Sequence, residues 1–118
     1  MLSSKLEVRI HDVLSMANMP FEEEYTFPDL VTSRGVPLRF DFAVMDDCGN
    51  VDFLIEAQGQ QHYRPVGRFG GAKALRVQMY NDRHKRDYCR VHGIRLVEVP
   101  YTDYDRISYD YIMHAAGY

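Results

Sequence analysis

The sequence is poor in the features that mark secreted and membrane proteins. Its 118 residues contain no hydrophobic run that approaches the roughly 18 apolar residues of a membrane-spanning helix. The first residues, MLSSKLEVRIHD, lack the apolar core of a signal peptide. Only two cysteines are present, Cys48 and Cys89, which indicates free thiols in a reducing compartment. We therefore expect a cytoplasmic protein that does not interact with a membrane.

Repeats, linkers and low-complexity segments are also absent, which bears on domain organisation. A chain of 118 residues is long enough to bury one hydrophobic core and too short for two. Hydrophobic residues make up 46% of the chain and charged residues 26%, the balance of an ordinary globular protein. We expect a single domain that covers residues 1–118.

Basic residues are scarce outside one segment, although the net charge of the chain is only −3. Residues 1–63 carry four basic and eleven acidic side chains, whereas residues 64–95 carry nine basic and two acidic ones, a net charge of +7. Such a basic block is able to bind a polyanion. It is equally typical of a solvated helix face whose arginines pair with the acidic part of the chain, so charge alone leaves both interpretations open.

The hydrophobic pattern predicts helices and strands in the order αβββαβα. Helices are expected over residues 3–17, 72–91 and 103–115. Strands are expected over residues 21–27, 38–45, 51–58 and 94–99. The turn DDCGN joins two of these strands, Gly93 closes the long helix, and Pro100 stops the last strand. The predicted fold class is α/β, with a central mixed four-stranded sheet and helices packed on it.

One predicted strand ends in polar residues, although most of its length is apolar. The segment FLIEAQGQQHY begins with buried-type residues and continues with a carboxylate, an amide and an imidazole. Because successive side chains of a strand point to opposite faces, Glu56 and Gln58 share one face, while Ile55 and Ala57 share the face toward the core. This pattern is unusual for a strand that serves only the core, and it indicates a functional site.

A second carboxylate is expected beside Glu56. Asp41 lies between two phenylalanines on the preceding strand, so its side chain is predicted to point away from both rings. The hairpin turn brings Asp41 within one register step of Glu56. Two adjacent carboxylates repel unless a cation lies between them, and such a pair suits Mg²⁺ with a substrate phosphate. The alternative is that one of these acids pairs with a nearby arginine, such as Arg39 or Arg64.

These residues, in an αβββαβ order, resemble the PD-(D/E)XK nuclease superfamily, through Pro37 and Asp41 on one strand and Glu56-Ala57-Gln58 on the next. More narrowly, RFDF…IEAQGQQHYRPV…FGG…GIRLVEVPY resembles phage and bacterial endonucleases related to the very-short-patch-repair endonuclease and the EDxHD homing endonucleases. The resemblance covers most of the chain, and Glu-x-x-Gly-x-Gln-His is its most specific part. It implies a restriction-endonuclease-like αβββαβ core with an extra C-terminal helix. It also implies a metal-dependent DNA endonuclease in the cytoplasm of a bacterial cell or phage-infected host.

The resemblance further implies a metal site and catalytic residues. Asp41 and Glu56 would bind Mg²⁺ or Mn²⁺, and Glu7 on the first helix would be a further ligand or support one. His62 and Asp82 match the histidine and the downstream acid of the EDxHD pattern. His62 would orient or deprotonate the attacking water, or protonate the leaving oxygen.

Gln58 departs from the usual superfamily pattern. A lysine normally stands two positions after the glutamate, where it polarises the water and neutralises charge. An amide orients a water but supplies no positive charge. Either Lys85, one turn after Asp82 and expected to hold the scissile phosphate, substitutes for that lysine, or His62 carries more of the chemistry. Without either, the protein would be a weak or inactive nuclease.

The basic block is then the expected DNA interface, because its field draws in the nucleic-acid backbone. The glycine-rich loop VGRFGG permits a close approach to phosphate. The expected DNA-binding residues are Arg64, Arg68, Lys73, Arg76, Arg83 and Arg86. A double-strand cutter of this size would act as a homodimer. Two alternatives stay open: a nuclease-fold module that binds nucleic acid without cutting it, and an interaction or anti-restriction protein on the same scaffold.

Overall fold

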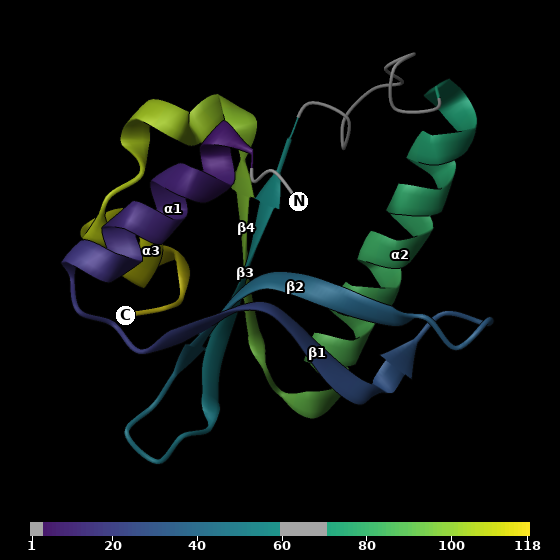
Figure 1. Cartoon of the computed structure of the whole chain (residues 1–118), viewed down its shortest axis with the longest axis horizontal. Helices are drawn as coiled ribbons and strands as arrows, with labels where there is room; N and C mark the ends of the chain where they lie inside the picture. The colour runs from purple at the N-terminus through teal and green to yellow at the C-terminus, as the bar shows by residue number, and fades with distance from the viewer. Residues whose placement is uncertain (1–3, 60–70) are drawn as a thin grey trace.

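A computed structural model describes residues 4–59 and 71–118 of the chain (Figure 1). The elements are α1 (Lys5–Met16), β1 (Phe21–Val31), β2 (Pro37–Met45), β3 (Val51–Gln58), α2 (Gly71–His92), β4 (Arg95–Pro100), the 3-10 helix η3 (Tyr101–Arg106) and α3 (Tyr109–Ala115). The strands form one sheet in the order β1-β2-β3-β4, in which β4 is parallel to β3 and the other pairs are antiparallel. The predicted α/β class, the mixed four-stranded sheet and the C-terminal helix are confirmed.

Helices lie on both sides of the sheet, with α1 and α3 together on one side and α2 on the other (Figure 1). Leu6, Ile10 and Leu14 repeat every four residues, and this stripe is buried against Phe53 and Ile55 of β3. Ser4 caps the helix, because its side chain accepts a hydrogen bond from the Glu7 backbone N–H at 3.1 Å. The first helix is therefore held by its apolar face and a serine cap.

Helix α2 packs on the sheet with only one end. Of its 22 residues, only Cys89 near the C-terminal end is buried. Cys89 belongs to a second apolar cluster with Leu38, Phe40, Ala43 and Leu54. The N-terminal part of α2 extends away from the strands (Figure 1). The fold thereby leaves one side of this helix accessible next to the sheet.

Strand β2 changes the face that it turns toward the core at Asp41. The prediction that the rings on either side of Asp41 share one face, opposite the carboxylate, is therefore wrong. Phe42 packs in the cluster of α1, whereas Phe40 packs in the cluster of α2. The two rings therefore do not share the face opposite Asp41. The backbone of the neighbouring strand is irregular at the same level, because Glu24, between the partners of Phe42 and Phe40, has φ of 50°, a conformation uncommon for a residue other than glycine.

The last predicted helix is divided into two. Residues 101–106 form η3 and residues 109–115 form α3, whereas a continuous helix was expected over residues 103–115. Ile107 is buried with an extended backbone, and Ser108 starts α3 by accepting a hydrogen bond from the Tyr111 N–H at 3.1 Å. A buried residue followed by a serine cap thus interrupts the helix. Strand β1 is also longer than predicted, since it continues to Val31.

Two further expectations concern thiols and membranes. Cys48 is exposed and Cys89 is buried, and both are free thiols, as predicted. Within residues 4–59 and 71–118, no helix combines the length and hydrophobicity that a membrane span requires.

Candidate active site

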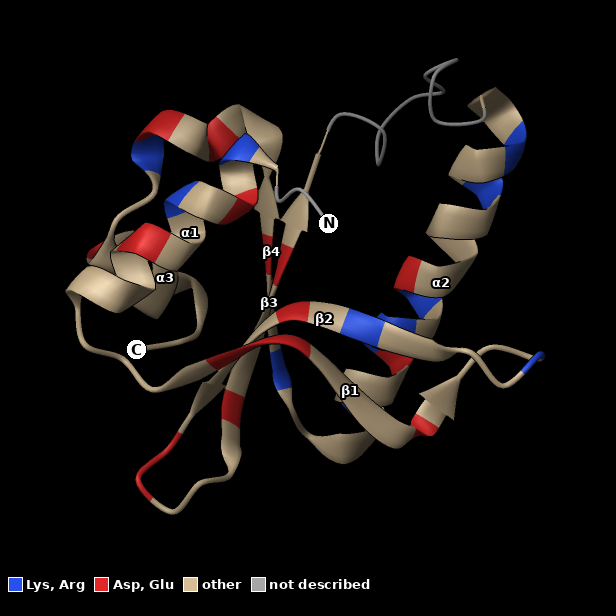
Figure 2. Cartoon of the chain, viewed as in Figure 1, with Lys and Arg blue, Asp and Glu red and all other residues tan. Residues whose placement is uncertain are grey.

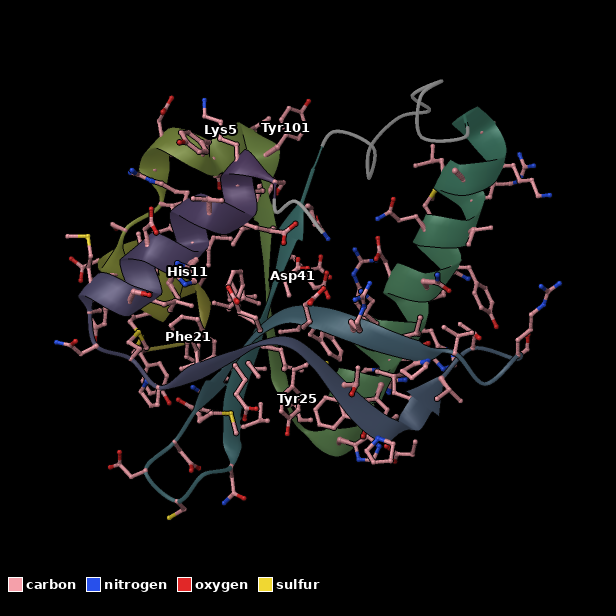
Figure 3. All side chains as sticks on the ribbon, in the orientation of Figure 1. Lys5, His11, Phe21, Tyr25, Asp41 and Tyr101 are labelled. Carbon is pink, nitrogen blue, oxygen red and sulfur yellow. The ribbon has the colours of Figure 1, made fainter. Side chains whose placement is uncertain are left out.

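Asp41 and Glu56 lie side by side on neighbouring antiparallel strands. Phe42 pairs with Ile55, so the two acids stand opposite each other at the next position of the antiparallel ladder. Asp41 Oδ2 accepts a hydrogen bond from the Ala57 backbone N–H at 2.7 Å, which ties this carboxylate to the strand that carries Glu56. Figure 3 shows Asp41 near the point where β2 crosses β3. The predicted proximity of the two acids is present in the structure.

Glu56 is a buried carboxyl group, with only 7% of the residue exposed. Burial raises the pKa of Glu56 to about 8; the Asp41 carboxylate adds to the rise, and the ammonium of Lys85 opposes it. The effect of burial outweighs that of Lys85, so the environment favours the protonated form of Glu56. Perturbed carboxyl groups of this kind gather at functional sites.

Lys85 of α2 brings a positive charge to this carboxyl. Its Nζ donates hydrogen bonds to Glu56 Oε1 and to the main-chain oxygen of Arg39, both at 2.9 Å. The ammonium lies 5.6 Å from the centre of the Phe40 ring, and the Lys85 side chain is only 13% exposed. The guanidinium of Arg39 instead pairs with Glu24 at 2.9 Å. A lysine from α2 is therefore a cation beside Glu56, and Arg39, one of the two arginines considered as a partner, pairs elsewhere; the other, Arg64, lies outside the described residues.

Gln58 and Asp82 lie near the pair formed by Glu56 and Lys85. Gln58 is 8% exposed at the end of β3, next to Pro100 of the parallel strand β4, so it is a buried residue. Asp82 lies one turn before Lys85 on α2, is partly buried, and is close enough to contribute to the raised pKa of Glu56. Four of the predicted catalytic residues, Asp41, Glu56, Asp82 and Lys85, thus gather at one place, with Gln58 on the same strand as Glu56.

Other predicted residues do not join this group. In the part of the chain that the structure describes, no group of three or more His, Cys, Asp or Glu side chains is arranged to hold a metal ion. Glu7 therefore does not complete a cluster with Asp41 and Glu56. The predicted residues His62, Arg64 and Arg68 lie outside the described residues.

The residues present still fit a magnesium ion. Mg²⁺ is commonly bound by one or two carboxylates together with waters and substrate phosphates, rather than by a cage of protein ligands. Asp41 and Glu56 supply those two carboxylates, and their mutual repulsion is one cause of the raised pKa of Glu56. A divalent cation between them would relieve that repulsion.

Two of the predicted DNA-binding arginines of α2, Arg76 and Arg83, lie on the side of the helix opposite Lys85. Arg76 and Arg83 are seven residues apart and so lie on one line along the helix. Arg83 is two residues from Lys85, which places the two side chains about 200° apart around the axis. Arg86 forms two hydrogen bonds with Glu98 of β4, one of them at 3.0 Å. Arg86 is thus an intramolecular partner, as the alternative interpretation of the basic block expects, and its partner Glu98 stands beside Glu56 in the β3–β4 register. Figure 2 shows acidic residues on β3 and β4 and basic residues along α2.

A pocket of about 450 Å³ continues from the site along α2. Sequence reasoning missed it, although residues at helical spacing on this side of α2 are small or polar instead of large and apolar. The pocket shares Asp82 and Lys85 with the carboxylate site. Its other lining residues are Leu38, Lys73, Ala74, Val77, Gln78 and Asn81.

Comparison with known proteins finds relatives in two viruses. The chain is 49% identical over 57 residues to Uncharacterized protein 094L of Frog virus 3 (isolate Goorha), a match that covers 47% of this chain and 37% of the relative. It is 41% identical over 58 residues to Uncharacterized protein 307L of Invertebrate iridescent virus 6, with 48% and 29% covered. The match thus spans about a third of the length of these relatives. No family model and no solved structure matches the chain.

Proposed function

We propose that this protein is a metal-dependent endonuclease that hydrolyses DNA phosphodiester bonds. The observation that carries the proposal is the buried Glu56 with Asp41 beside it and Lys85 Nζ at 2.9 Å. Phosphodiester hydrolysis needs anionic ligands for a cation and positive charge for the developing charge on phosphate. These three side chains offer both at one place, next to a pocket that is open to a substrate.

Asp41 and Glu56 would hold Mg²⁺ or Mn²⁺. When bound, the cation lowers the pKa of a water molecule and stabilises the charge that develops on the phosphate. Because ligands must be deprotonated, binding of the cation requires Glu56 to lose its proton, and the cation itself favours that loss. Asp41 stays fixed by its bond to the Ala57 N–H, so one ligand is held in position before the cation binds.

Lys85 would supply the positive charge that Gln58 lacks. It reaches Glu56 from α2, whereas the superfamily lysine would reach the site from β3. A cation on Glu56 would compete with the Lys85–Glu56 bond and leave the ammonium available to contact a substrate phosphate. Asp82, one turn away, would orient that ammonium, and the Gln58 amide would orient a water.

The remaining parts of the proposal concern the substrate and its setting. The basic block, net +7 over residues 64–95, would draw the DNA backbone toward α2. A double-strand cut would require two copies of the chain, because one site hydrolyses one strand. We propose that the protein acts in the cytoplasm of an infected cell; the viral source of the two relatives supports the infected cell and does not bear on the compartment.

A second candidate function is a module that binds nucleic acid without cutting it. Two observations favour it: Gln58 stands where the superfamily has lysine, and the Lys85–Glu56 bond already compensates the buried carboxyl group. In this case the basic block and the pocket would serve binding alone.

A supercoiled-plasmid assay tests the first proposal. We expect nicked or linear DNA with Mg²⁺ or Mn²⁺ and none with EDTA. Glu56→Gln and Asp41→Asn should each lower the rate at least about a hundredfold. Asparagine retains an oxygen that can accept from the Ala57 N–H, so the fold should be preserved. The matched control is Glu22→Gln, an exposed acid on β1.

Each outcome of that assay has a defined meaning. Metal-dependent cleavage that is lost in both site variants and kept in Glu22→Gln supports the nuclease. Cleavage by Glu56→Gln at the rate of the wild type would overturn the nuclease proposal. DNA binding in EDTA without any cleavage by the wild type would support the second candidate instead.

A further inference from the structure

We infer that the pocket between α2 and β2 binds one unpaired nucleobase of the substrate strand, next to the phosphate on which the Glu56 site acts. This inference deepens the proposed function and rests on it. It assigns the pocket a ligand class and gives the enzyme a preferred substrate: DNA that contains an unpaired nucleotide at the cutting site.

The walls of the pocket match the two kinds of surface that a nucleobase presents. Leu38, Ala74 and Val77 form an apolar wall suited to the flat face of a base. Gln78 and Asn81 add side-chain amides, which both donate and accept hydrogen bonds, as the edge of a base does. The volume of about 450 Å³ lies within the range of roughly 300–1,000 Å³ found for small-molecule sites.

Cationic residues at both ends of the pocket favour a nucleotide within a strand over a neutral ligand. Lys73 lies at one end and Lys85 at the other. They are twelve residues apart on α2, which corresponds to about 18 Å along the helix axis. This distance exceeds the spacing of neighbouring phosphates, so a strand that follows α2 would bring two non-adjacent phosphates near the two ammonium groups, with the bound base between them. A purely apolar ligand would use neither lysine.

The base must be unpaired to reach this wall. Within a duplex the faces of a base are covered by its neighbours and its edge is paired, so a base enters a protein pocket only from a single strand or after extrusion. A gap, flap or bulge avoids the cost of extrusion. The shared residues Asp82 and Lys85 connect the pocket to the carboxylate site, which places the unpaired nucleotide beside the phosphate to be cut.

Two valines of α2 provide a matched pair of variants. Val77 lines the pocket and is 53% exposed, whereas Val91 is 68% exposed and is not among the residues that line it. Val77→Trp would fill the pocket without disturbing the core. Val91→Trp adds the same bulk to the same helix elsewhere. Asn81→Ala is a second pocket variant that removes an amide without adding volume.

The experiment measures equilibrium binding in EDTA by fluorescence anisotropy. The probes are a labelled duplex with a single unpaired nucleotide and the same duplex fully paired. We expect the wild type and Val91→Trp to bind the unpaired probe about tenfold more tightly, the size of one base contact. Val77→Trp should bind both probes equally, and Asn81→Ala should lose part of the preference. Circular dichroism confirms that each variant is folded.

The outcomes separate this inference from the nuclease proposal, because EDTA prevents metal-dependent cleavage. A wild type that cuts DNA with Mg²⁺ but binds both probes equally would overturn the pocket assignment and leave the nuclease standing. The pocket assignment would also be overturned if Val77→Trp and Asn81→Ala both kept the preference for the unpaired probe. A preference that both variants reduce, in a protein that never cuts, would support the pocket and count against the nuclease.

Discussion

Lys85 on α2 and Glu56 on β3 are joined by a hydrogen bond of 2.9 Å, although 29 positions separate them in the sequence. Both side chains are nearly withdrawn from water, at 13% and 9% exposure. A buried pair of this kind adds little net stability, because desolvation offsets the attraction, but removing one partner leaves the other uncompensated. The pair therefore links the position of the helix to the protonation of the carboxyl group.

Lys85→Met will abolish cleavage without unfolding the protein. Burial already raises the pKa of Glu56 to about 8, and loss of Lys85 removes the group that lowers it, so Glu56 will stay protonated and neutral at pH 7. We expect a cleavage rate at least about a hundredfold lower in single-turnover assays, because charge stabilisation at the phosphate is lost. Arg90→Met, which removes an exposed cation from the same helix, is the control. A Lys85→Met protein that cuts at the rate of that control would remove Lys85 from the mechanism.

Gln58→Lys should rescue the Lys85→Met variant. Residues 56 and 58 lie on one face of β3, so a lysine at 58 brings a cation to Glu56 from the strand instead of the helix. The double variant should recover at least about tenfold of the lost rate. The measurement is the single-turnover rate of the single and double variants at equal folded concentration. A folded double variant with no gain over Lys85→Met would show that only a lysine from α2 serves this site.

The stability of the metal-free protein should fall as the pH rises from 5 to 8. The folded protein binds a proton at Glu56 up to about pH 8, whereas the unfolded chain releases it near pH 4.5, so the folded state holds more protons in this interval. Unfolding free energy therefore decreases with pH, and we expect the melting temperature to fall across this interval. Glu56→Gln should flatten this dependence, and Glu22→Gln should keep it. If the melting temperature in EDTA changes with pH equally in the wild type and in Glu56→Gln, the pH dependence does not come from Glu56.

Local patterns were sufficient to predict most of the fold. The spacing of Leu6, Ile10 and Leu14 indicates α1, and the alternation after the DDCGN turn indicates that Glu56 and Ile55 face opposite sides of β3. Both features depend on residues close together in the chain, where the 3.6 and 2.0 residue periods apply. The adjacency of the two carboxylates followed in the same way from a short hairpin.

Features that depend on distant residues were not predictable. The bond from Lys85 to Glu56 requires α2 to cross the sheet where Cys89 packs with Leu54, and nothing local determines that crossing. The change of face at Asp41 coincides with the positive φ of Glu24 in the neighbouring strand, which the sequence does not indicate. The break before α3 is different, because a serine N-cap is a signal present in the sequence.

The two arginines Arg83 and Arg86 should respond differently to substitution, because within residues 4–59 and 71–118 only Arg86 has a carboxylate partner on another element. Arg86→Gln breaks the pair with Glu98 and should lower the melting temperature by a few degrees with little effect on DNA affinity. Arg83→Gln should leave stability unchanged. If the side of α2 that carries Arg76 and Arg83 contacts phosphate, Arg83→Gln should reduce the slope of log affinity against log salt by roughly 0.7–0.9. Anisotropy titrations from 50 to 200 mM salt, with thermal melts, check both. An unchanged slope in Arg83→Gln would show that this side of α2 does not contact DNA, and that DNA binds to the side of the helix that lines the pocket.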